Sequence, residues 1–122
     1  PNAKDQFIEK VEDVKSLPFT VNETRDDAIV FDLGKTQQLK SFYYLPDQSI
    51  QHKGLVSHYE IYVGKEKADM QKVAEGEFSN IRNHPIMQEV HFTPTDGRYL
   101  KLKAVRMVKE GEAIGFDKCA IQ

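Results

Sequence analysis

The sequence predicts an all-β domain, an antiparallel β-sandwich or jelly roll, from three observations. From residue 28 onward, short segments rich in β-branched and aromatic residues follow one another, with no helical period of useful length. Turn residues such as Leu33-Gly34-Lys35 and Thr95-Asp96-Gly97 separate these segments. Apolar and polar residues alternate within several of them, which gives a strand one dry face and one wet face.

The first 27 residues are read separately from the strands. Residues 4–17, KDQFIEKVEDVKSL, place Phe7, Val11 and Val14 at helical spacing with charges on the other face, which predicts a short amphipathic helix. Alternatively, residues 14–21 extend as a strand, since Pro18 stops a helix at Leu17 or before. We therefore expect one domain overall, with residues 1–27 as an N-terminal extension, a linker or a first strand and residues 28–122 as the sandwich.

Seven strands are predicted after this segment. They are residues 28–33 (AIVFDL), 39–45 (LKSFYYL), 58–63 (HYEIYV), 71–76 (QKVAEG), 88–93 (QEVHFT), 98–108 (RYLKLKAVRMV) and 116–121 (FDKCAI). The sixth shows the pattern most clearly, because Leu100, Leu102 and Ala104 alternate with Lys101 and Lys103. Strands of this length and spacing are typical of a sandwich that buries one face of each sheet.

Composition and charge limit the kinds of binding partner that the chain can have. The 122 residues suffice for one domain, 39% are hydrophobic, and seven Phe and five Tyr can build a core. A net charge of −2 with dispersed Lys and Arg gives no footprint for nucleic acid or an anionic membrane, and no apolar run could span a bilayer. The lone Cys119 excludes an internal disulfide. We expect no nucleic acid and no membrane insertion.

Motifs of catalysis are missing from the sequence. It has no glycine-rich phosphate loop, HExxH, GxSxG or paired CxxC. The four histidines, His52, His58, His84 and His91, lack the helical spacing of a zinc site, and His58 and His91 fall on predicted solvent faces of strands. We predict neither catalytic residues nor a metal site.

Two polar connections are the candidate binding surfaces. Residues 46–57, PDQSIQHKGLVS, form a connection longer than usual, and residues 79–87, SNIRNHPIM, are dense in amide, guanidinium and imidazole groups. Such groups hydrogen-bond sugar hydroxyls, and Tyr or Phe can stack on the apolar face of a sugar ring. The alternative for each connection is a solvated turn.

Four stretches, in order, resemble the discoidin family, also called factor V/VIII type C domains, which includes the family 32 carbohydrate-binding modules. They are "IVFDLGKTQQLKSFYYLP", "GLVSHYEIYVGKE", "KVAEGEFSNIRNHPIMQEVHF" and "GRYLKLKAV". The match covers about residues 28–108. "FYYLPDQ" and "GEFSNIRNHPIMQ" look most like the versions appended to bacterial exo-glycosidases such as α-L-fucosidases and β-hexosaminidases.

The resemblance implies a discoidin-like jelly roll without catalytic activity. It implies a secreted, periplasmic or cell-surface bacterial glycoside hydrolase as the parent, and a glycan or terminal sugar and the parent's catalytic domain as partners. The expected function is therefore carbohydrate binding through loops at one end of the sandwich. The alternative is an accessory domain that braces the catalytic domain and binds no sugar itself.

Family members also carry a structural Ca²⁺, and this sequence departs from the pattern that holds it. The corresponding regions read "VNETRDDAIVF" and "FDKCAIQ", without Trp or Asp-Gly and with Ala120 about where a Glu ligand would fall. Asp26, Asp27 or backbone carbonyls are the remaining oxygen donors. The usual calcium ligands are thus unmatched, and no cofactor is predicted.

The ligand loop departs from the family as well, since Asp47, Gln48, His52 and Lys53 stand where sugar-binding members often place Arg and Asn. Asp47 can accept hydrogen bonds from vicinal hydroxyls, and His52 and Lys53 can donate. Without Trp, the candidates for a stacking face are Tyr43, Tyr44 and Phe78, of which Tyr44 is preferred, although burial in the core is the ordinary fate of such aromatics. Weaker candidates are Asn80, Arg82, Asn83 and His84, because turn formation also explains them.

Overall fold

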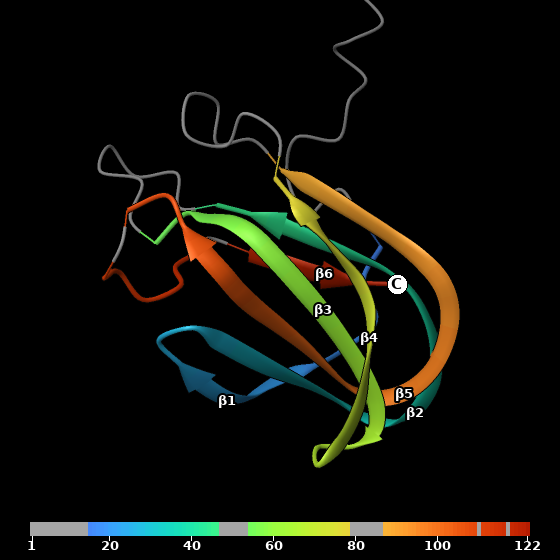
Figure 1. Cartoon of the computed structure of the whole chain (residues 1–122). Coiled ribbons are helices and arrows are strands. Elements are labelled where there is room, and N and C mark those ends of the chain that lie inside the picture. Colours follow the sequence, from blue (N-terminus) through green and yellow to red (C-terminus); the bar gives the residue numbers. More distant parts are fainter. Residues whose placement is uncertain (1–14, 47–53, 79–86, 110, 117) are drawn as a thin grey trace, which may run out of the picture.

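The computed structural model describes residues 15–46, 54–78, 87–109, 111–116 and 118–122. These residues form six strands and no helix, and so include no helical segment able to cross a bilayer. The strands are β1 (Thr20–Arg25), β2 (Ala28–Leu45), β3 (Val56–Glu66), β4 (Asp69–Glu77), β5 (Gln88–Met107) and β6 (Lys118–Ile121) (Figure 1). All neighbouring strands run antiparallel.

Two long strands, β2 and β5, build both layers of the molecule. The strands pair in the order β1-β2-β5-β3-β4, and β6 pairs with the second half of β2. The first half of β2 and the second half of β5 lie with β1, β3 and β4 in one layer, while their other halves and β6 form the second. Figure 1 shows β2 and β5 curving together between the layers. The predicted antiparallel β-sandwich is confirmed.

The bend in these strands lies where the sequence predicts two turns. Gln37 and Leu39 of β2 pair with Gly97 and Thr95 of β5, so the two polar stretches face each other in one ladder. The register is interrupted between Asp32 and Gln37, beside Gly34 with its positive φ of 84°. The predicted segments 28–33 and 39–45 thus belong to one strand, β2, and 88–93 and 98–108 belong to another, β5, which ends at Met107. The prediction of four separate strands here was wrong, because pairing between the two stretches outweighs their local turn signals.

An ion pair fixes the bend. Arg98 donates from Nε to Asp32 Oδ1 at 2.9 Å and from a terminal nitrogen to Oδ2 at 3.0 Å, and the amide of Gly34 donates to the same carboxylate at 2.8 Å. The hydrogen bond from Arg98 is the main reason that the pKa of Asp32 lies below its ordinary value. Asp32 belongs to the stretch "DLG" and Arg98 to the stretch "GRYL" of the sequence. These two stretches therefore hold the bend of β2 and β5 in place.

The core lies between the two layers. Its fully buried large side chains are Ile29, Phe31, Leu39, Phe42, Tyr44, Val56, Ile61, Val63, Leu100, Leu102 and Ile121. The alternation predicted for β5 is confirmed, because Leu100, Leu102 and Ala104 are buried while Lys101 and Lys103 stay partly exposed. Non-polar burial of this extent is the main source of stability for a domain without disulfides.

The N-terminal segment joins the sandwich within the described residues. Most of the predicted helix over residues 4–17 lies outside them, and residues 15–17 belong to no regular element. The amide of Leu17 donates to the carbonyl of Ile121 at 2.7 Å, and β1 pairs with β2 through contacts such as Thr20 with Asp32. This strand begins at Thr20, later than the alternative strand over 14–21 would have it.

Candidate functional site

The ends of four strands meet at one end of the sandwich, which we call the loop end. Tyr44 near the end of β2 pairs with Gln88 at the start of β5, and Val56 at the start of β3 pairs with Met107 at the end of β5. Glu77 at the end of β4 pairs with His58 near the start of β3. The residues that flank both predicted loops therefore gather at this end.

Hydrogen bonds fix the base of the loop end. The buried hydroxyl of Tyr44 donates to the carbonyl of Gly115 at 2.9 Å and to that of Gly54 at 3.3 Å. The amide of Gly115 donates to the carbonyl of Gly54 at 3.0 Å, and the amide of Gly54 donates to Glu112 Oε1 at 3.0 Å. Gly54 has a φ of 71°, and a Cβ there would overlap the backbone of Gly115. The start of β3 is thus held to residues 111–116.

Three aromatic rings stack beneath this end. Phe78 lies between Tyr44, with ring centroids 5.1 Å apart, and Tyr59, with centroids 4.4 Å apart, and both pairs are close to parallel. Tyr44 has no exposed surface and Phe78 is buried. The expectation that Tyr44 is a stacking face for a ligand was wrong, since its ring is used inside the core. Tyr43, on the opposite face of β2, is buried as well.

A row of polar side chains lies on the outer face next to the loop end. His58 of β3 pairs with Glu77 of β4 on one side and with Arg106 of β5 on the other. His58 Nε2 is 3.9 Å from Glu77 Oε2, and its Nδ1 is 3.1 Å from Ser57 Oγ. His58 is on a solvent face, as predicted, and the row sets an acceptor carboxylate and two nitrogen donors side by side.

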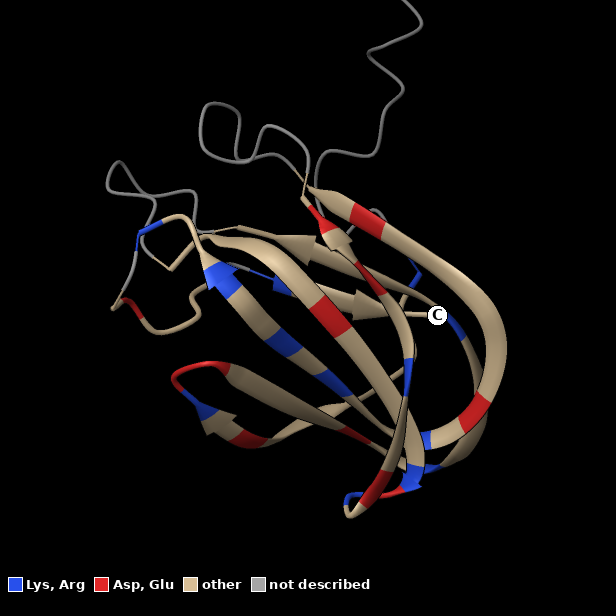
Figure 2. Ribbon diagram, in the orientation of Figure 1, with Lys and Arg blue, Asp and Glu red and all other residues tan. Residues whose placement is uncertain are grey.

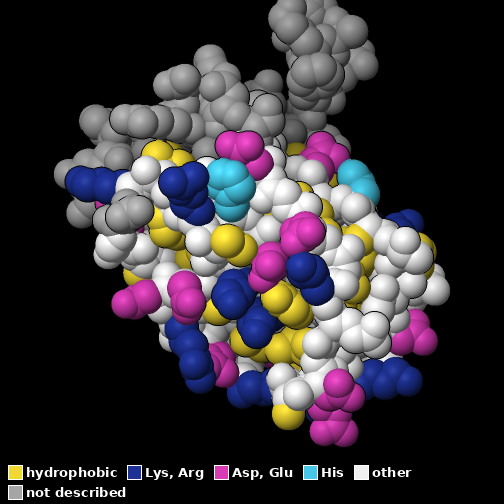
Figure 3. All heavy atoms as spheres, in the orientation of Figure 1, with side chains coloured by type: hydrophobic (Ala, Val, Ile, Leu, Met, Phe, Trp, Pro, Cys, Tyr) yellow, Lys and Arg dark blue, Asp and Glu magenta, His cyan; other side chains and the backbone are white. Residues whose placement is uncertain are grey.

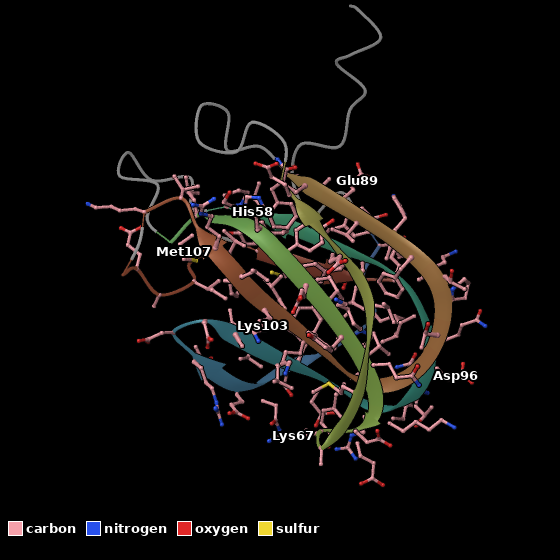
Figure 4. All side chains as sticks on the ribbon, in the orientation of Figure 1. His58, Lys67, Glu89, Asp96, Lys103 and Met107 are labelled. Atoms are coloured by element: carbon pink, nitrogen blue, oxygen red, sulfur yellow. The ribbon has the colours of Figure 1, made fainter. Side chains whose placement is uncertain are left out.

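A bulge in β5 adds an apolar side chain to this row. Because the register shifts between His58 and Tyr59, Val105 is an extra residue in β5 and is 57% exposed. A shallow cavity of about 460 Å³ is lined by His58, Val105, Arg106, Met107 and Gly111. Figure 4 labels His58 and Met107 close together at this end. Arg106 and Val105 could not be predicted as site residues from the sequence, because strand alternation carries no sign of a bulge.

The other predicted site residues fall outside the described residues. Asp47, Gln48, His52 and Lys53 lie within 47–53, and Asn80, Arg82, Asn83 and His84 lie within 79–86. Their roles stay predictions. The described neighbours that flank them, Pro46, Gly54, Phe78 and Met87, are all buried parts of the framework.

The described residues gather no group of three His, Cys, Asp or Glu side chains that could hold a metal ion. The carbonyls of Asp26 and Asp27, at the β1–β2 turn, accept hydrogen bonds from the amides of Ile114 and Ala104 at 3.0 and 2.8 Å. These oxygens therefore already serve the backbone network. The usual calcium ligands of the family stay unmatched at these positions, and no calcium site is assigned to them.

Comparison with known families and structures gives consistent matches. The model of the F5/8 type C domain family matches residues 17–115. A comparison with curated protein sequences finds no significant match. A solved glycoside hydrolase 29 family member from an unknown rumen bacterium is similar, with 30% identity and a TM-score of 0.77, over 85% of this chain and 18% of that one.

Two further structures show the range of the likeness. A putative alpha-L-fucosidase from Bacteroides ovatus has 27% identity and a TM-score of 0.76 over 96% of this chain and 21% of its own. The family 32 CBM from Clostridium perfringens NanJ, solved in complex with galactose, has 22% identity and a TM-score of 0.65 over 82% of this chain and 69% of its own. This chain thus spans less than a quarter of the two longer proteins.

Proposed function

Because the chain belongs to the F5/8 type C domain family, we propose that it is a non-catalytic carbohydrate-binding module that holds terminal sugars at the loop end of its sandwich. The observation that carries the proposal is the row Glu77, His58 and Arg106 beside the exposed Val105. A carboxylate, nitrogen donors and an apolar side chain are the groups that a sugar with hydroxyls and C–H faces requires.

Residues of the neighbouring loop would complete the site. We assign Asp47 as the acceptor for two vicinal hydroxyls and His52 and Lys53 as donors, with Gln48 as a further amide contact. Asn80, Arg82, Asn83 and His84 are weaker candidates. The rigid base formed by Tyr44, Gly54 and Gly115 supports this assignment, because binding loops act best on a fixed scaffold. Tyr44 itself contributes through this base and not as a ligand contact.

The parent protein is part of the proposal. The two similar chains of which this one spans 18% and 21% are a glycoside hydrolase and a putative fucosidase, which supports a bacterial glycoside hydrolase as the parent. The site of action would then be secreted, periplasmic or on the cell surface. The complex of the similar NanJ module with galactose supports a terminal hexose as the ligand.

A glycan array tests the proposal. We expect wild type to bind a set of glycans with a common terminal sugar and Asp47→Ala and His52→Ala to lose that binding. Asp96→Ala is the matched control, because Asp96 is an exposed carboxylate in the bend, far from His58 and Met107 (Figure 4). A flat array, or equal binding by all four proteins, would contradict the proposal.

A second function is favoured by one observation. The whole enzymes are more similar to this chain, at 30% and 27% identity, than the isolated galactose-bound module at 22%. This favours a domain that braces a catalytic domain and binds no sugar itself. Removal of residues 15–122 from the parent would then lower the stability of the catalytic domain, whereas a sugar-binding module would leave that stability unchanged and reduce only binding to glycan.

A further inference from the structure

A groove runs along β2 on the outer face of the layer that contains β1, β3 and β4. In one row across the sheet Val30 pairs with Glu23 of β1 and Lys101 of β5, and in the next Ala28 pairs with Arg25 and Lys103. Two short side chains thus lie between longer ones on both sides. The result is a cavity of about 320 Å³ with an apolar floor and charged walls, which we call the β2 groove.

The β2 groove is positively charged on a protein that is negative overall. Four basic and two acidic side chains line it, a formal charge of +4 − 2 = +2, whereas the whole chain carries −2. Figure 2 shows Lys and Arg bands along the second half of β5, and Figure 3 shows dark-blue side chains gathered beside apolar atoms. An anionic ligand is therefore attracted to this place on the molecule.

Of the two acidic side chains in the lining, Glu23 is already paired with basic neighbours. Glu23 accepts a hydrogen bond from Arg25 and lies 3.5 Å from Lys67 Nζ, and the bond from Arg25 lowers the pKa of Glu23. Lys101 Nζ lies over the ring of Tyr62, 4.8 Å from its centroid, which orients the ammonium group. Lys103, labelled in Figure 4, lies opposite Glu60 of β3 in the ladder, and the pKa of Glu60 is lowered first by the Tyr62 hydroxyl and also by the charges of Lys72 and Lys103.

We propose that the β2 groove binds a carboxylate-bearing sugar residue, a hexuronate, of an acidic glycan. The carboxylate accepts hydrogen bonds from Lys101 and Lys103, whose Cα atoms are about 7 Å apart along β5. The apolar face of the ring packs on Ala28 and Val30 in the floor, and Met70 adds an apolar side chain to the lining. This site is separate from the loop end and does not depend on the function proposed for it.

An acidic peptide fits the β2 groove less well. A peptide adds to a sheet by hydrogen-bonding a free strand edge, but β2 already pairs with β1 on one side and β5 on the other. The floor consists of short side chains over only two rows, and 320 Å³ is near the lower limit of ligand pockets. These dimensions suit one ring with a compact charge.

Calorimetric titration with trigalacturonate tests the proposal. We expect binding at low salt that weakens as NaCl rises toward about 1 M, where the screening length falls to about 3 Å. The double variant Lys101→Glu/Lys103→Glu should bind trigalacturonate at least about tenfold more weakly than wild type. The double variant Lys101→Gln/Lys103→Gln removes both positive charges without adding a negative charge beside Glu60, and it should also bind more weakly. Lys40→Glu, at an exposed site on β2 in the other layer, should bind like wild type.

Each other outcome overturns the proposal. Equal affinity for neutral trigalactoside would remove the role of the carboxylate, and hexaglutamate binding without trigalacturonate binding would identify a peptide site. Equal affinity of Lys40→Glu and the two double variants for trigalacturonate would exclude the β2 groove as its binding site. Asp47→Ala should keep trigalacturonate binding, and the double variants should keep the array profile, so the β2 groove and the loop end fail separately.

Discussion

The hydroxyl of Tyr44 should contribute to stability and not to ligand binding. Tyr44→Phe removes a buried donor that bonds the carbonyls of Gly115 and Gly54 at 2.9 and 3.3 Å. Gly54 keeps the hydrogen bond from the Gly115 amide, so only the Gly115 carbonyl loses a strong bond. A net hydrogen bond is worth about 1 kcal/mol and an unsatisfied buried acceptor adds to the cost. We expect a loss of about 1–2 kcal/mol.

Urea unfolding measures this loss. With a slope m of about 2 kcal/mol/M, the midpoint should fall by about 0.5–1 M without a change in m. Tyr43→Phe is the control, since its hydroxyl bonds Gln122 Oε1 at 3.2 Å at a half-buried site where water can replace it, and we expect less than about 0.5 kcal/mol. An unchanged midpoint for Tyr44→Phe, or lost glycan binding at unchanged stability, would refute the reasoning.

Three other changes test the bend and the core. Gly97→Ala should lower the free energy of unfolding in urea by about 1–3 kcal/mol, because the added Cβ would overlap Val63 Cγ1. The double change Gly97→Ala/Val63→Ala should cost less than the sum of the two single changes, and additive losses would contradict this contact. Arg98 lowers the pKa of Asp32 in the folded state, so the contribution of Asp32 to the free energy of unfolding is complete above its ordinary pKa of 3.8 and is lost as pH falls through the lowered value. Asp32→Asn should therefore make stability, measured as urea midpoints from pH 7 to pH 2.5, fall less steeply at acidic pH. An identical fall in wild type and variant would count against the ion pair. Cys119, whose thiol pKa is raised by burial, should not react with a disulfide reagent in the native protein and should react once per chain in denaturant, and rapid native labelling would show that it is not buried as described.

The fold class follows from local patterns, but strand continuity does not. Leu100, Leu102 and Ala104 were assigned to the correct face by alternation alone. In contrast, the stretches "GKTQQ" and "TPTDG" read as turns because each is polar and holds a glycine. Only their pairing with each other, more than fifty residues apart, keeps β2 and β5 continuous through the bend. A single sequence holds no direct record of such a pairing.

The sequence predicts where the candidate site lies better than it predicts which residues form it. The loop end was expected from the long polar connections, and His58 was expected on a solvent face. Tyr44 was misassigned because alternation tells which residues share a face but not whether that face is covered, and Phe78 covers it. Arg106 joins His58 only because of the bulge at Val105, which depends on the register between β3 and β5.

Titration of the labelled protein with galactose, followed by backbone amide NMR, tests sugar binding at the loop end most directly. We predict saturable shifts at Gly54, Leu55, His58 and Arg106, which are lost in Asp47→Ala and kept in Asp96→Ala. Amides of the β2 groove, such as those of Ala28 and Val30, should not move with this neutral sugar. No shift with galactose or with any glycan retained on the array, or shifts confined to residues away from the loop end, would contradict the proposed function.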